Sequence, residues 1–471
     1  MRFFDVGIKI LSISLKVLSQ KPMKKNLFSF LFLVLFAGSM FAQQKMAVAT
    51  TKLNTAKLDS LFNLLEINNK SMGSLAISEN GKVIYSKSIG FSDVENKVKP
   101  NENTKYRIGS ISKMFTSVLI FKAIEEKKLT LDDKIDVYFP TLENAKIITV
   151  GNLLNHRSGV FDFTKDESIV QFSLSPKTEK ELLGLIMKGK SNFAPDSKGE
   201  YCNSNYVLLT FILEKIYKKS YKDILKEKII SPLQLKNTHY GTKINPKNNE
   251  SFSYDFEEKW IKSTETDMSV PLGAGALIST PTDLNKFIEA LFAKKLISES
   301  SLALMTTIKE KFGYGIFQAI TPTTSGDKIG FWHNGGIDEF SSILQHFPKE
   351  NVTISYISNG NTYINKNIFA AVFKIYFNQS FQMPVFYQPK TEDLDKYLGV
   401  YTSNDIPLKL TVTRKGTSLI IQGTNQPEFM VEPVEKNIFK LEQVGAVLEF
   451  NSTKKEMTLK QNGMNILFTK E

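Results

Sequence analysis

Apolar residues between positions 57 and 89 follow two different periods. Between positions 57 and 69 they recur every three or four residues, which predicts an amphipathic helix. These apolar residues are Leu58, Leu61, Phe62 and Leu65. Alternating runs follow at 74–78 and 82–89, and the turn Glu79-Asn80-Gly81 between them predicts a β-hairpin.

A helix-rich stretch at 110–305 separates this hairpin from a second group of strands. Alternation predicts those strands at 328–333, 341–347 and 352–358, with a polar turn at 348–351 joining the last two. Strands on both sides of a helical middle indicate one α/β or α+β domain, whose sheet is completed by distant segments.

The last part of the chain has a period of two throughout. It follows a polar, proline-containing segment at 378–392, which we interpret as a linker. Turns such as Gln422-Gly423 and Asn462-Gly463 separate the alternating runs. The sequence therefore predicts a first domain at 43–377 and a separate antiparallel β domain at 393–471, in the form of a small barrel.

The first 42 residues have the pattern of an export signal. Met23-Lys24-Lys25 precedes an uncharged apolar run at 27–41, and Ala42-Gln43 offers a cleavage position. The run is shorter than the roughly 20 residues that a membrane-spanning helix needs. We therefore expect residues 1–42 to be a signal, with Met23 as a candidate true start, and the protein to reach the periplasm or the extracellular space. An uncleaved anchor is the alternative, and this segment would be the one point of membrane contact.

The composition excludes several other classes of protein. Of 471 residues, 42% are hydrophobic and 23% are charged, as in ordinary globular proteins. The net charge is +12, of which the first 42 residues supply +5, and the remaining basic residues form no cluster that would bind nucleic acid. Cys202 is the single cysteine, so no internal disulfide can form. The four histidines have no paired spacing, and we expect neither a metal nor another cofactor.

Three short motifs, in a fixed order, carry the candidate chemistry. They are Ser110-Ile111-Ser112-Lys113, Tyr201-Cys202-Asn203 and His333-Asn334-Gly335-Gly336. Ser-x-x-Lys also occurs at Ser325/Lys328, and Tyr-x-Asn and His-x-Gly recur as well. The order and the local context of one copy of each motif therefore carry the signal.

The first motif has the residues of a serine nucleophile with a lysine base. Ser110 precedes an apolar run that predicts a buried helix, and Lys113 lies on the same face three residues on. Free N–H groups at a helix start can stabilise an oxyanion. Burial and the positive helix end both disfavour an ammonium ion, so Lys113 could be partly neutral and act as a base. A capping serine with a solvated lysine is the alternative for this motif alone.

The other two motifs could supply proton transfer and substrate contacts. Tyr201 could move the leaving-group proton if a nearby cation lowers its pKa, and Asn203 could bond a substrate amide. Gly335 and Gly336 follow a predicted strand, where the Gly336 N–H could be a second oxyanion donor. The alternatives are an ordinary loop with a helix-capping asparagine, and a tight turn in which His333 lies at the surface.

Taken together, the three motifs resemble the active site of the penicillin-binding protein and class C β-lactamase-related serine hydrolases. Segments 153–159, 231–235 and 275–284 support the resemblance, which covers about residues 55–375. It implies an α/β (α+β) β-lactamase/transpeptidase-like sandwich with a central antiparallel sheet, in addition to the C-terminal all-β barrel-like domain. The active site would lie at the sheet edge, beside the Ser-x-x-Lys helix.

By that resemblance Ser110 is the acylated nucleophile, Lys113 and Tyr201 are the acid/base pair, and Asn203 contacts the substrate. His156, in segment 153–159, has no catalytic counterpart and is expected to be structural.

The third motif departs from the β-lactamase pattern. His333-Asn334-Gly335 stands where β-lactamases of this family carry Lys-Thr-Gly, and neutral histidine is a weaker anchor for a carboxylate than lysine. This resembles the esterase, D-aminopeptidase and D-alanyl carboxypeptidase branches, with His333, Gly335 and Gly336 beside the substrate. We expect an exported serine hydrolase acting on a D-amino-acid peptide or a small ester or amide. The alternatives are a class C-like β-lactamase and a penicillin-binding sensor with little turnover.

Overall fold

A computed structural model describes residues 53–416, 418–441 and 444–471. The predicted export signal, 1–42, lies outside the described residues. Among the residues that are described, no helix has the length and apolar character needed to cross a membrane.

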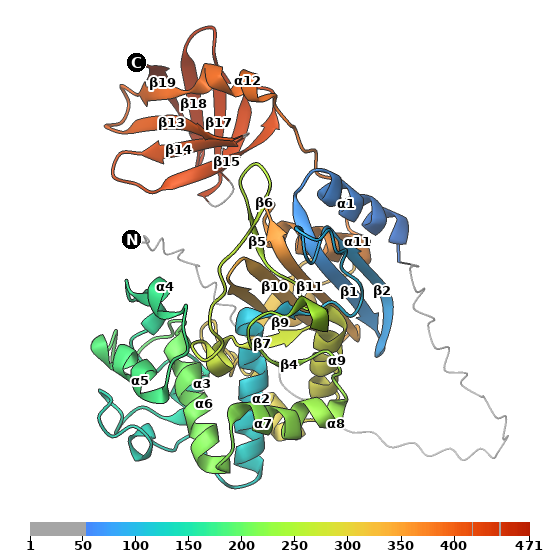
Figure 1. The fold of residues 1–471 in the computed structure, drawn as a ribbon, viewed down its shortest axis with the longest axis vertical. Helices are drawn as coiled ribbons and strands as arrows, with labels where there is room; N and C mark the ends of the chain where they lie inside the picture. Colours follow the sequence, from blue (N-terminus) through green and yellow to red (C-terminus); the bar gives the residue numbers. More distant parts are fainter. Residues whose placement is uncertain (1–52, 417, 442–443) are drawn as a thin grey trace, which may run out of the picture. The chain divides into compact units, whose positions relative to one another are not determined.

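A six-stranded antiparallel sheet with the order β2-β1-β11-β10-β9-β8 forms the centre of the first domain (Figure 1). Its strands are β1 (Ser71–Glu79), β2 (Lys82–Ile89), β8 (Phe317–Thr321), β9 (Lys328–Ile337), β10 (Phe340–Phe347) and β11 (Val352–Asn361). The N-terminal strand β1 pairs with β11 along its whole length, so distant segments complete one sheet, as predicted.

The predicted hairpin is confirmed, and one strand is longer than predicted. Asn80 and Gly81 both have positive φ, the backbone that a two-residue turn between twisted strands requires. The strand predicted at 328–333 continues to Ile337, because its last residues pair with the start of β10. The glycines of the third motif therefore lie inside β9, near its end.

Helices cover both faces of the sheet. On one face lie α1 (Thr55–Ile67) and α11 (Asn365–Tyr376), and the four apolar residues of the predicted stripe in α1 are fully buried there. Along β11, Ile354 and Tyr356 point into this core, whereas Ile357 points to the other face. That face packs against α9 (Pro281–Phe292), next to α2 (Ser112–Glu125) and α6 (Asn203–Tyr217). Because successive side chains of β11 point to opposite faces, this buried strand contributes to both cores.

Short strands that local spacing did not predict lie within the helix-rich stretch and just before it. The remaining helices are α3 (Val150–Leu154), α4 (Ile169–Phe172), α5 (Glu179–Lys188), α7 (Tyr221–Leu225), α8 (Ser231–Leu233) and α10 (Glu299–Thr306). The short strands are β3 (Tyr106–Arg107), β4 (His239–Tyr240), β5 (Tyr254–Phe256), β6 (Trp260–Lys262) and β7 (Leu277–Ser279). They form sheets β3-β7-β4 and β5-β6 beside the helices.

The C-terminal part is a closed barrel of eight antiparallel strands, which confirms the predicted all-β barrel. Residues 379–390, within the predicted linker, form neither helix nor strand, and α12 (Thr391–Leu394) follows them. The barrel strands are β12 (Gly399–Thr402), β13 (Lys409–Lys415), β14 (Ser418–Gly423), β15 (Glu428–Glu435), β16 (Ile438–Leu441), β17 (Ala446–Asn451), β18 (Glu456–Gln461) and β19 (Met464–Lys470). Their inward-facing residues make a separate core.

Candidate active site

Ser110 lies in a short 3-10 turn, η1 (Gly109–Ile111), that leads directly into α2. Gly109 has a φ of +50°, and a Cβ there would lie 2.7 Å from the Gly336 nitrogen. The turn that carries Ser110 is therefore packed directly against the end of β9. The helix start at Ser110 was predicted from the sequence, whereas its contact with β9 was not.

Lys113 is completely buried beneath Ser110. Its Nζ lies 3.0 Å from Ser110 Oγ, 2.9 Å from Asn203 Oδ1 and 2.8 Å from the Ala274 carbonyl oxygen. Burial lowers the pKa of Lys113 to about 7, although the negative charge of Asp162 acts in the opposite direction. Near pH 7, Lys113 is therefore a neutral amine in a large share of the molecules, and this amine contacts the candidate nucleophile. The alternative of a solvated lysine is wrong.

Tyr201 and Asn203 enter the site from the start of α6. The Lys113 Nζ lies 4.9 Å from the centre of the Tyr201 ring. Burial raises the pKa of Tyr201 above its ordinary value, although a hydrogen bond with Ser110 opposes this. The condition set from the sequence, a Tyr201 pKa lowered by a nearby cation, is not met, because the effect of burial is the largest one on this phenol. Tyr201 is therefore a phenol at neutral pH and has a proton to donate.

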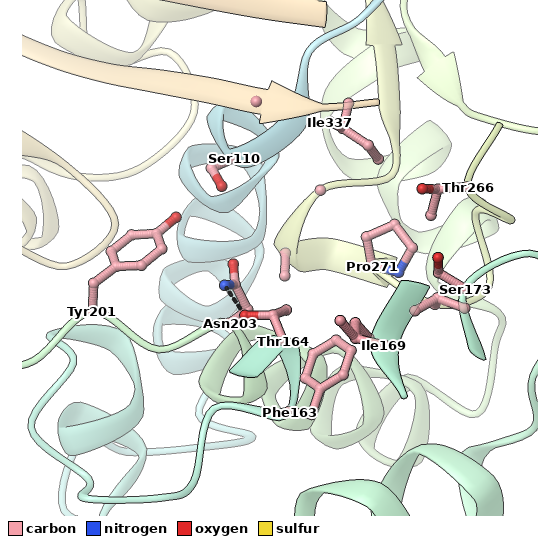
Figure 2. Close-up of a pocket in the computed structure, with 14 residues that line it drawn as sticks. Ser110, Phe163, Thr164, Ile169, Ser173, Tyr201, Asn203, Thr266, Pro271 and Ile337 are labelled. Atoms are coloured by element: carbon pink, nitrogen blue, oxygen red, sulfur yellow. Dashed lines mark hydrogen bonds between the residues drawn. The ribbon is translucent and has the colours of Figure 1, made fainter. Parts of the chain in front are cut away.

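Asn203 is held from two sides. Its Oδ1 accepts from Lys113, and its Nδ2 donates to Asp162 Oδ2 and to Thr164 Oγ1, at 3.2 Å in both cases (Figure 2). This amide does not cap its helix, because all of its hydrogen bonds are to other side chains. The structure therefore brings Ser110, Lys113 and Asn203 into one hydrogen-bonded chain.

His333 is buried, so the alternative of a surface histidine is wrong. Its Nδ1 lies 2.5 Å from the Asn334 carbonyl oxygen, and its ring packs against Phe317 and lies near Tyr201. Burial lowers the pKa of His333 to about 3, and the charge of Lys113 acts in the same direction. The imidazole is therefore neutral and lies behind Tyr201 rather than in the lining of the pocket. Direct contact of His333 with a substrate stays a prediction.

His156 has the structural role expected for it. Its Nδ1 accepts a hydrogen bond from the Cys202 backbone N–H at 3.1 Å, and its ring lies 4.5 Å from that of Tyr201. It thus holds the loop that presents Tyr201.

A buried arginine clamp, which sequence reasoning missed, joins the two sides of the site. Arg107 Nη1 lies 2.7 Å from Asp338 Oδ2, and its Nη2 lies 3.1 Å from Glu265 Oε2. Nη1 also donates to the Thr266 carbonyl, and the Thr266 N–H donates to Asp338. Arg107 lies three residues before Ser110, and Asp338 lies two after Gly336. The clamp therefore fixes the separation of the two backbone segments that would bind an oxyanion.

Ser110, Tyr201 and Asn203 border a pocket of about 330 Å³. Their side chains supply polar groups to it (Figure 2), and Gly336 is also part of its lining. The rest of the lining is mainly apolar, with Ser173 and Thr266 among the apolar residues Phe163, Ile169, Val270, Pro271 and Ile337. The pocket thus suits a small substrate with an apolar side group next to the bond that reacts.

Gly335→Ala is expected to damage both the site and the fold. A Cβ at this position would lie 2.0 Å from the Ile108 carbonyl oxygen, so β9 would have to move away from the turn that holds Ser110. We expect kcat to fall by about 10²–10³, as for loss of one oxyanion donor, and stability to fall by about 1–3 kcal/mol. Steady-state kinetics and thermal melting measure the two effects. Gly184→Ala, where nothing lies within 4 Å of the added Cβ, is the control; equal kcat in the two variants would contradict the assignment.

Comparisons with known proteins identify relatives of this chain. Residues 68–374 match a family model described as Beta-lactamase. Protein flp from Staphylococcus aureus (strain MW2) is 28% identical over 305 residues, which cover 61% of this chain and 59% of that protein. The chain thus spans less than two thirds of that relative's length. Penicillin-binding protein 4* from Bacillus subtilis (strain 168) is 25% identical over 421 residues, which cover 83% of this chain and 93% of that protein.

Solved structures show the same fold. The penicillin-binding protein homologue from Pyrococcus abyssi superposes with a TM-score of 0.64 at 20% identity, covering 88% of this chain and 100% of that one. D-amino acid amidase from Ochrobactrum anthropi SV3, complexed with L-phenylalanine amide, gives a TM-score of 0.60 at 24% identity, covering 69% of this chain and 99% of that one.

Proposed function

Because this chain belongs to the Beta-lactamase family, we propose that it is an exported serine hydrolase that forms an acyl-enzyme at Ser110. Its substrate is a D-amino-acid peptide or a small ester or amide. One observation carries the proposal: Ser110 lines the pocket, and its hydroxyl lies 3.0 Å from a fully buried lysine amine. The pattern of residues 1–42 supports export.

The residues of the site suit an acyl-transfer reaction in two steps. Lys113 takes the hydroxyl proton while Ser110 attacks the substrate carbonyl carbon, and the N–H groups of Ser110 and Gly336 stabilise the oxyanion. Tyr201, protonated at neutral pH, gives a proton to the leaving group as the acyl-enzyme forms. The Lys113 ammonium then returns its proton to the Tyr201 phenolate, which restores the neutral amine and the phenol. Water attacks the ester while Lys113 takes one of its protons, and that proton passes to the Ser110 oxygen as the acyl group leaves.

The surroundings of His333 favour an ester or amide over a β-lactam. A buried neutral imidazole supplies no positive charge to a substrate carboxylate at the position where β-lactamases of the family have lysine. The fold itself, which D-amino acid amidase shares, is compatible with such a substrate. A class C-like β-lactamase and a penicillin-binding sensor remain the alternatives.

A substrate panel distinguishes these activities. Purified protein is assayed with p-nitrophenyl esters, D-amino-acid p-nitroanilides and a chromogenic cephalosporin. We expect turnover of an ester or anilide, and cephalosporin hydrolysis within tenfold of the blank. Rapid cephalosporin turnover would identify a β-lactamase instead, and labelling by a fluorescent penicillin without product release would identify a sensor.

The rate of acylation is expected to depend on pH through Lys113. Since the amine must be neutral to act as a base, kcat/KM for p-nitrophenyl acetate should rise with pH through an apparent pKa of about 7. Burial lowers the pKa of His156 and of His333, so these rings lose their protons at lower pH. A profile that is flat from pH 5 to pH 9 would contradict Lys113 as the base.

A further inference from the structure

We propose that Asp162 is a positioning residue for the catalytic amine. By fixing the orientation of the Asn203 amide, it keeps the lone pair of neutral Lys113 directed at the Ser110 hydroxyl. This inference rests on the proposed function, because it assigns an orientation to the base of that reaction.

The hydrogen bonds of Lys113 define where its lone pair lies. A neutral amine has two N–H donors and one lone pair, and Nζ has three partners at 2.8–3.0 Å. The Asn203 and Ala274 carbonyl oxygens can only accept, so they take both N–H groups. The third partner, the Ser110 hydroxyl, can donate. The lone pair therefore faces the proton that a general base must remove.

This arrangement depends on which end of the Asn203 amide faces the lysine. If the amide turned over, its NH₂ group would donate to the lone pair of Lys113 and block it. The Asp162 carboxylate opposes this turn, because it can only accept and therefore requires the NH₂ end of Asn203. Thr164 favours the same orientation only through Asp162, because its single hydroxyl proton is donated to Asp162 Oδ1 and its oxygen is then left to accept from Asn203.

Asp162 is itself held in place. It is buried, and it caps the short 3-10 helix η3 (Phe163–Lys165). Its Oδ1 accepts from the Thr164 N–H at 3.2 Å and from Thr164 Oγ1 at 2.9 Å, which leaves Oδ2 for Asn203. Oδ1 thus bonds to Thr164, and Oδ2 bonds to the Asn203 amide that contacts Lys113.

Asp162 is also the charged group with the largest effect on the pKa of Lys113. The other groups that face this amine are the Tyr201 and Tyr206 rings, the Cys202 thiol, and the neutral imidazoles of His156 and His333. Burial lowers the pKa of Lys113, and the charge of Asp162 partly offsets that effect. Removing the charge should lower this pKa further.

Asp162→Asn tests the orientation. The variant has one acceptor oxygen, which the Thr164 N–H takes, so its NH₂ group faces Asn203 and turns that amide over. We expect the high-pH plateau of kcat/KM for p-nitrophenyl acetate to fall by about 10², the lower end of what a general base contributes. The acid limb, the pH range over which kcat/KM rises, should move to lower pH, because the pKa of Lys113 falls further once the negative charge of Asp162 is gone. A purely structural lesion would lower the plateau and leave the limb in place.

The exchanged pair Asp162→Asn/Asn203→Asp provides a rescue. The carboxylate at 203 accepts from Lys113 and from the new amide, so each donor again meets an acceptor. The plateau should recover at least tenfold relative to Asp162→Asn, with the limb moved to higher pH because a carboxylate now contacts the amine. Asn203→Asp alone places two carboxylates together and should not show this recovery. If Asp162→Asn is too unstable to assay, the exchanged pair must exceed Asn203→Asp alone tenfold.

Asp166→Asn is the matched control, because this carboxylate lies in the same segment but bonds to Ser168 and Lys188. It should leave plateau and limb unchanged, with folding of every variant checked by thermal melting. If Ser110→Ala retains fluorophosphonate labelling, the proposed function fails. If Ser110→Ala abolishes labelling while Asp162→Asn keeps the wild-type plateau and limb, this inference alone is overturned. Loss without a limb shift, and without rescue, overturns it too.

Discussion

Ser110→Ala is expected to lower kcat by on the order of 10⁶, the loss seen when an essential serine nucleophile is removed. The substitution takes away the oxygen that would carry the acyl group, and it leaves Lys113 no hydroxyl proton to accept. The backbone of η1 need not change, since the Ser110 hydroxyl contacts the side chains of Lys113 and Tyr201 rather than the main chain. Steady-state hydrolysis of p-nitrophenyl acetate and mass spectrometry after fluorophosphonate treatment measure the loss.

The second Ser-x-x-Lys motif provides the control for this prediction. Ser325 is exposed in a turn, where its hydroxyl shares a hydrogen bond with Thr323, and Lys328 of the same motif pairs with Glu350. Ser325→Ala should therefore keep full activity and labelling. Labelling of Ser110→Ala at the wild-type rate would show that another residue is the nucleophile.

Lys113→Met is expected to lower acylation by about 10³–10⁴, toward the upper range for loss of a general base. It should also change how stability depends on pH. The unfolded chain keeps the ordinary lysine pKa of 10.5, whereas burial lowers the folded-state value to about 7. Between these values the unfolded state binds more protons, so the free energy of unfolding rises with pH. Relative to Lys113→Met, the wild type should gain about 5 kcal/mol in total across this window.

Denaturant unfolding of both proteins at pH 6, 8 and 10 measures this difference. Lys122, on the same helix, offers a control, because its side chain is only partly buried. Lys122→Met should retain activity and show a smaller change with pH. A stability difference between wild type and Lys113→Met that is constant from pH 6 to pH 10 would mean that Lys113 stays charged when folded.

The sequence was sufficient to predict the parts of the site that have a local signature. Ser110 and Lys113 share a helix start, and the Tyr201-x-Asn203 and Gly335-Gly336 motifs stand at the ends of regular elements, so spacing alone marked them. The hairpin was predictable because an Asn-Gly turn allows positive φ at both positions.

What could not be predicted depends on contacts between distant segments. Asp162 meets Asn203 across 41 positions, and Arg107 meets Asp338 across 231. Neither contact leaves a periodic trace in the chain. The direction of the Tyr201 pKa could not be predicted for a related reason: burial, which the three-dimensional packing creates, raises it.

Because of the arginine clamp, substitutions that change substrate selectivity at the loop containing Glu265 and Thr266 would also change the catalytic rate. Glu265 and Thr266 belong to a loop beside the pocket, but they are bound to the same guanidinium that secures Asp338 behind Gly336. Breaking a buried ion pair from one side costs about 3–5 kcal/mol, so changes at Glu265 would alter selectivity and disturb the oxyanion donors together. Ile169 and Val270 line the pocket without contacting this guanidinium, and new specificities can arise there with the chemistry left intact.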